Sequence, residues 1–138
     1  MSSTQKLMLT KQSFGKNLKA MGKKAAYFIT SDDDFIAANR AREIFEELSK
    51  DALDEMSKEV IDGASQKAED AARACAQTLQ AAATLPLFGG AKYVWLRNAN
   101  FFGDAKILKN EEVATTLAKL VEYLKKLSPE NAVVVINA

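Results

Sequence analysis

The sequence has no histidine and one cysteine among its 138 residues. Without histidine, the chain has no Ser-His-Asp or Cys-His catalytic arrangement and no histidine-ligated metal site. Cys75 has no partner for an internal disulfide, which is typical of a protein from a reducing compartment. These absences exclude the hydrolases and metalloproteins that depend on histidine.

Long apolar runs and an excess of one charge are also missing. No segment approaches the ~18 apolar residues of a transmembrane helix, and the first twelve residues, MSSTQKLMLTKQ, lack the apolar centre of a signal peptide. The 19 lysines and arginines face 18 acidic residues, so the whole protein has no general attraction to nucleic acid or to an anionic membrane. We therefore expect a cytoplasmic protein with no membrane partner.

Apolar residues make up 48% of the chain, enough for the core of one globular domain. Apolar positions at helical spacing predict four helices, over residues 10–21, 31–50, 65–83 and 110–127. Short apolar or β-branched runs predict four strands, over residues 24–30, 57–63, 91–99 and 132–138. This alternation predicts an α/β fold in three layers, a parallel sheet with helices on both faces and the last strand near its centre.

The predicted helices each present one apolar face to this sheet. The expected core positions are Ala37, Ala41, Ile44, Phe45 and Leu48, then Ala68, Ala72, Cys75 and Leu79, then Val113, Leu117, Leu120, Val121 and Leu124. Asn110 is the expected N-cap of the last helix. Because the last strand ends at the final residue, we expect the chain to be part of a longer protein.

The turn after the first predicted strand tests for nucleotide chemistry, because open α/β sheets bind ligands beyond the carboxyl ends of their strands. Here it reads Ser31-Asp32-Asp33-Asp34, with neither the glycines nor the Lys-Ser/Thr pair of a phosphate loop. Three carboxylates would also repel a triphosphate. We expect no cofactor, no metal and no catalytic residue.

The acidic turn allows a second interpretation, a magnesium-dependent phosphoacceptor domain of the receiver type built on Asp32 and Asp33. Such a site needs an aspartate after the third strand, where this sequence has Arg97 and Asn98. The plainer alternative, which the sequence favours, is that Ser31 and the aspartates cap the following helix and match its dipole.

The connection Thr84–Gly90, TLPLFGG, is apolar where a loop is usually polar. Its large side chains either pack beneath the sheet or bind a partner, and spacing alone favours packing. Pro86 limits the freedom of this connection, and Gly89 and Gly90 allow a sharp turn into the next strand.

Three blocks, AAYFITSDDDFIAANRAREI, TLPLFGGAKYVWLRNANFF and AVVVINA, together resemble the amino-terminal domain of the bacterial DNA polymerase III delta subunit, part of the sliding-clamp loader. The resemblance covers nearly the whole chain. It implies a degenerate P-loop NTPase fold of the AAA+ type that no longer binds ATP. It also implies a non-catalytic subunit of a DNA-directed DNA polymerase complex, with residues 1–138 forming one domain and the family's lid and collar domains absent.

The resemblance assigns a role to the apolar connection. In the family, a leucine and a phenylalanine at this place enter a hydrophobic pocket of the sliding clamp, the beta subunit, and help to open the ring. They match Leu87 and Phe88, which Pro86 would present, while Leu85 stays a core candidate. Two glycines directly after Phe88 depart from the family's usual pattern. The alternative is a purely structural α/β module in which the Leu-Phe pair belongs to the core.

The first 24 residues contain six lysines and no acid. No repeated interleaving of aromatic residues and no base-reading motif accompanies them, so we expect a solvated face with at most weak or indirect contact to DNA. Other clamp-loader subunits are implied partners of the full-length protein only, and we expect the isolated domain to be a monomer.

Overall fold

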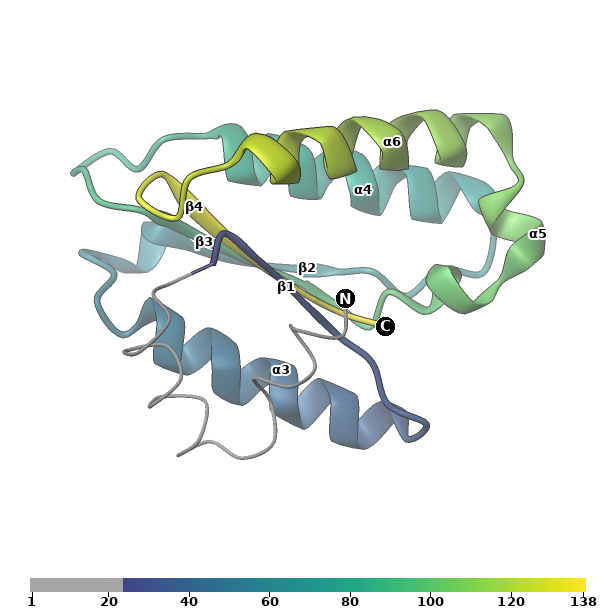
Figure 1. The fold of residues 1–138 in the computed structure, drawn as a ribbon, viewed down its shortest axis with the longest axis horizontal. Coiled ribbons are helices and arrows are strands. Elements are labelled where there is room, and N and C mark those ends of the chain that lie inside the picture. Colours follow the sequence, from purple (N-terminus) through teal and green to yellow (C-terminus); the bar gives the residue numbers. More distant parts are fainter. Residues whose placement is uncertain (1–23) are drawn as a thin grey trace.

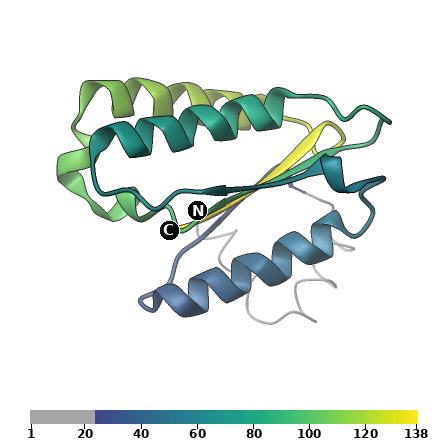
Figure 2. The ribbon, with the colours of Figure 1, turned by 180° about the vertical axis from the view of Figure 1, so that it is seen from behind.

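The computed structural model describes residues 24–138. The predicted helix over residues 10–21 and every amino-terminal lysine before Lys24 lie outside the described residues. Within them, a parallel four-stranded sheet separates one long helix from two others (Figures 1 and 2). The predicted three-layer α/β fold is therefore confirmed.

The strands lie in the order β1-β4-β3-β2, so the last strand of the chain pairs on both sides, as predicted. The strands are β1 (Ala26–Ile29), β2 (Lys58–Asp62), β3 (Lys92–Arg97) and β4 (Ala132–Asn137). The long helices are α3 (Asp34–Ser49), α4 (Ala68–Ala83) and α6 (Glu111–Lys126). Shorter turns of helix are η1 (Glu55–Ser57), η2 (Asn100–Gly103) and α5 (Ala105–Leu108).

The two central strands divide their side chains between the two faces of the sheet, because successive residues of a strand point to opposite sides. Val94 and Leu96 of β3 belong to the core beneath α4 and α6, whereas Tyr93 and Trp95 belong to the core beneath α3. The residues of β4 alternate in the same way. Both strands are buried on both faces, which explains why they read as continuous apolar runs.

Helix α3 buries all five of its predicted core residues, from Ala37 to Leu48. Its N-cap is Asp33, whose carboxylate accepts from the backbone N–H of Phe35 at 2.9 Å. The Ser31 hydroxyl oxygen accepts from the N–H of Asp33 at 3.2 Å. The predicted capping is therefore confirmed, but Asp32 and Asp33 precede the helix and only Asp34 lies in its first turn.

Helices α4 and α6 lie side by side on the other face (Figure 1). Ala72 and Cys75 are buried as predicted, and the small side chains of α4 allow α6 to approach closely. Asn110 caps α6 by accepting from the N–H of Val113 at 3.2 Å. Val121, in contrast, is 41% exposed. The prediction of a core position was wrong because Val121 lies ~100° around the helix from the buried Leu120.

No described helix combines the length and the apolar character needed to cross a membrane.

Candidate functional site

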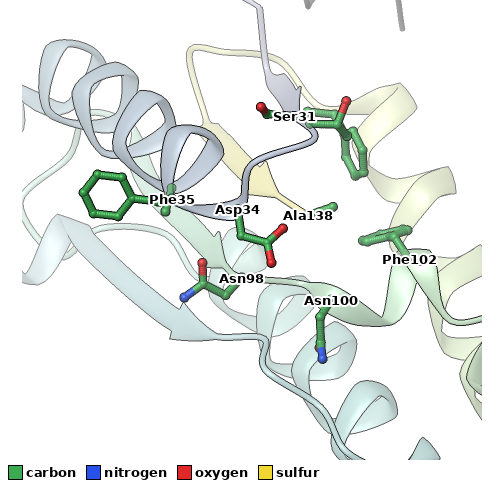
Figure 3. Close-up of a pocket in the computed structure, with 11 residues that line it drawn as sticks. Ser31, Asp34, Phe35, Asn98, Asn100, Phe102 and Ala138 are labelled. Carbon is green, nitrogen blue, oxygen red and sulfur yellow. The ribbon is translucent and has the colours of Figure 1, made fainter.

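A hollow of about 900 Å³ opens beyond the carboxyl ends of β1, β3 and β4, where this class of sheet usually binds ligands (Figure 3). Its wall combines three aromatic side chains, those of Phe28, Phe35 and Phe102, with polar residues that include Asp34 and Asn98. Figure 3 shows the Asp34 carboxylate near Asn98, with Phe102 across the hollow from Phe35. The place is therefore suited to contacts with rings or aliphatic groups more than with phosphates.

The asparagine side chains at this hollow form hydrogen bonds that hold the fold together. The Asn98 side-chain oxygen accepts from the Asn137 amide at 3.1 Å, and the Asn137 oxygen accepts from the Trp95 indole N–H at 2.8 Å. Asn100 accepts from the N–H of Ser65 and donates to its carbonyl oxygen, at 2.8 and 3.0 Å. Asn98 stands where a receiver domain needs its nucleophile, in the left-handed region at φ 56°.

The acidic turn also has a structural role, because one carboxylate oxygen of Asp33 accepts from the backbone N–H groups of Phe35 and Ile36 at the start of α3. Within residues 24–138, no three acidic or cysteine side chains come together as a metal site would require. Cys75 lies in the core, where burial raises the pKa of its thiol to about 11. The Cys75 thiol therefore stays neutral near neutral pH. At the carboxyl end of the sheet, the capping bonds of Asp33 favour the structural interpretation of Asp32 and Asp33.

The opposite edge of the sheet carries the apolar connection between α4 and β3. Helix α4 ends at Ala83, and the Gly89 N–H donates to the Pro86 carbonyl oxygen at 3.3 Å. This bond closes a four-residue turn whose two corner residues are Leu87 and Phe88. Gly89 and Gly90 follow at φ 84° and 79°, values that favour glycine, so the sharp exit expected from the sequence is present.

The side chains of this connection face solvent. Leu87 is 80% exposed and Phe88 is 67% exposed, so the burial that spacing alone favours does not occur. Leu85 is 73% exposed, and its prediction as a core residue was wrong. The connection projects beyond the amino ends of the strands (Figures 1 and 2), so no sheet lies beneath these side chains to bury them. Pro86, between them, is partly buried.

The fold and the sequence define a class: a three-layer α/β domain with a parallel four-stranded sheet, whose sequence contains no phosphate loop. The family model for the DNA polymerase III delta subunit matches residues 27–138, and the chain belongs to this family. The delta subunit is a non-catalytic component of the clamp loader that serves the replicative DNA polymerase. No curated protein and no solved structure matches the chain significantly.

Proposed function

We propose that this chain is the clamp-binding domain of a longer clamp-loader subunit, and that Leu87 and Phe88 bind an apolar pocket of the sliding clamp. The observation that carries the proposal is the exposure of these two large apolar side chains, 80% and 67%, at the two corners of one turn. Soluble proteins seldom gather large apolar side chains at a loop tip unless the tip binds something.

The energy available from this turn is sufficient for specific binding. Burying a leucine or a phenylalanine side chain contributes ~1.5–3 kcal/mol before the costs of association. Because Leu87 and Phe88 are mostly exposed, nearly all of that burial is still available to a partner. Removing both side chains should therefore weaken binding by about two to four orders of magnitude.

A proline and a backbone hydrogen bond restrict the turn before it binds, which reduces the entropy lost on association. Pro86 restricts the backbone on the amino side of Leu87, and its carbonyl oxygen holds the Gly89 N–H. Pro86 thus presents the two apolar residues without entering the pocket deeply itself. Gly89 and Gly90 then return the chain to β3.

In this account the bound turn helps to open one interface of the clamp ring. The other clamp-loader subunits contact parts of the full-length protein outside this domain, and DNA is reached indirectly. The setting is the bacterial cytoplasm, where the replicative polymerase works, and the isolated domain is a monomer.

Calorimetric titration of the chain into its cognate sliding clamp tests the proposal. The Leu87→Ala/Phe88→Ala variant should bind about 10²–10⁴-fold more weakly while keeping its thermal unfolding temperature. Phe35→Ala is the matched control, because Phe35 is a phenylalanine of similar exposure, 73%, at the opposite edge of the sheet. Its affinity should stay within about threefold of the parent's.

Two results would refute the proposal. Equal binding by the parent and by the folded double variant would show that the turn does not bind the clamp. Unfolding of the double variant would show that the pair supports the core, as a purely structural module requires.

A further inference from the structure

Exposed apolar side chains gather at the amino edge of the sheet beyond the Leu87–Phe88 turn. Nine large apolar side chains are exposed among residues 24–138, and five of them lie in the two connections that lead into β2 and β3. These five are Leu53, Met56, Leu85, Leu87 and Phe88. Since β2 and β3 are parallel neighbours, both connections project from the same end of the molecule (Figures 1 and 2).

The two connections touch each other. A Cβ atom placed on Gly90 would lie 3.4 Å from Leu53 Cδ1, so the Leu53 side chain rests against the backbone that follows the Leu87–Phe88 turn. Leu53 nevertheless remains 63% exposed and offers most of its surface to a partner. Met56, in η1, is 76% exposed.

Both connections are anchored to the same part of the core. Ala52 precedes Leu53 and Ala91 follows Gly90, and both alanines pack against the cluster beneath α3. On the other side of Leu53, the Asp54 carboxylate accepts from the Ser57 N–H at 3.0 Å, which fixes the turn that carries Met56. The two connections are therefore held beside each other at the same end of the sheet, with Leu53 next to the backbone at Gly90.

The area of the turn alone points to such a larger surface. A specific protein interface buries roughly 800 Å² on each partner, whereas a phenylalanine supplies only about 150–250 Å². A leucine and a phenylalanine at one turn therefore fall short of a usual interface. In the neighbouring connection, Leu53 beside Gly90 and Met56, two residues after Asp54, are exposed apolar residues that can extend it.

We propose that Leu53 and Met56 form, with Leu87 and Phe88, one two-connection docking surface for the sliding clamp. This inference rests on the proposed function. Leu87 and Phe88 enter the apolar pocket of the clamp, and Leu53 and Met56 cover the apolar clamp surface beside it. The contact at Gly90 makes the second connection continuous with the first.

The test compares three double variants by titration into the cognate clamp: Leu53→Ala/Met56→Ala, Leu87→Ala/Phe88→Ala and, as control, Phe35→Ala/Ile36→Ala. Phe35 and Ile36 are two exposed apolar residues at the opposite edge, at the start of α3. The first variant should bind about 10–100-fold more weakly, since residues around a central anchor contribute less than the anchor. The control should stay within about threefold, and all three should unfold at the parent's temperature.

The outcomes separate the two proposals. If Leu87→Ala/Phe88→Ala weakens binding and Leu53→Ala/Met56→Ala does not, the docking surface is overturned and the proposed function stands. If Leu87→Ala/Phe88→Ala has no effect, the proposed function fails and the docking surface fails with it.

A single variant separates contact from positioning. Removing Leu53 also removes the side chain that rests on Gly90, whereas Met56 has no atom within 4 Å of a Cβ on that residue. Met56→Ala alone should therefore weaken binding by about three- to tenfold through lost contact. An unchanged affinity would show that Met56 does not contact the clamp, and the proposed two-connection surface would be wrong.

Discussion

Replacing Asn137 by alanine should destabilise the fold more than its place at the end of the last strand suggests. The Asn137 side chain is 1% exposed and accepts from the Trp95 indole N–H at 2.8 Å. It also donates to the Asn98 side-chain oxygen at 3.1 Å. This one amide therefore joins β4 to β3 and to the residue that leaves β3 at a positive φ.

The expected loss follows from the two bonds. Trp95 is 7% exposed, so its indole N–H would lose its partner in a place that water reaches poorly. An unsatisfied buried donor costs about 1–3 kcal/mol, and the lost bond to Asn98 adds roughly 1 kcal/mol. The Asn137→Ala variant should therefore lose about 2–4 kcal/mol of its free energy of unfolding.

Urea unfolding followed by circular dichroism measures this loss, and the fluorescence of Trp95, the one tryptophan in the chain, reports the local change. A second variant, Asn137→Ala/Trp95→Phe, removes the orphaned donor together with its partner. The two substitutions should therefore cost at least 1 kcal/mol less together than the sum of their separate costs. A loss below about 0.5 kcal/mol for Asn137→Ala would show that the Trp95 indole N–H is not left as a buried donor without a partner, since such a donor costs more than that.

Three further results are expected. Gly63→Ala should cost about 1–3 kcal/mol in urea unfolding, because its Cβ would lie 3.0 Å from the Arg97 carbonyl oxygen; an unchanged midpoint would contradict the close approach. Burial raises the folded-state pKa of Cys75 from 9.0 to about 11, so its contribution to stability is complete below pH 9 and declines as the pH rises towards 11. A thiol reagent at pH 8 should then label the folded chain far more slowly than the urea-unfolded chain, and equal rates would show an accessible thiolate. Acetyl phosphate with magnesium should leave the chain unlabelled, since Asn98 replaces the nucleophile and Asp33 caps α3; an acyl phosphate at Asp32 or Asp33 would restore the receiver interpretation.

The regular elements could be predicted because their residues repeat with the period of the structure. The face of α3 from Ala37 to Leu48 has helical spacing and is buried throughout. Strands β3 and β4 are apolar at consecutive positions because both of their faces are covered. The capping roles of Asp33 and Asn110 were predictable because the side-chain chemistry of an N-cap is local.

The connections were harder to predict, because an apolar residue in a connection can either be buried in the core or be exposed to solvent. Leu85 is a large apolar residue of the kind that usually lies in a core. It is exposed because the connection that carries it projects beyond the sheet. Phe101 shows the reverse: it lies in η2, a turn that periodicity did not reveal, and it is fully buried against α4 and α6. Leu53 and Met56 were missed because each is an isolated apolar residue in an acidic stretch, DALDEMSK, with no periodic signal.

Photo-crosslinking tests most directly whether the Leu87–Phe88 turn contacts the sliding clamp. A photoreactive benzoylphenylalanine at position 88 and, in a separate preparation, at position 35 would be irradiated with the cognate clamp, and the products mapped by mass spectrometry. We expect position 88 to crosslink to residues lining an apolar pocket of the clamp and position 35 to give no clamp adduct. Adducts from position 35 but not from position 88, or equal diffuse adducts from both, would contradict the account.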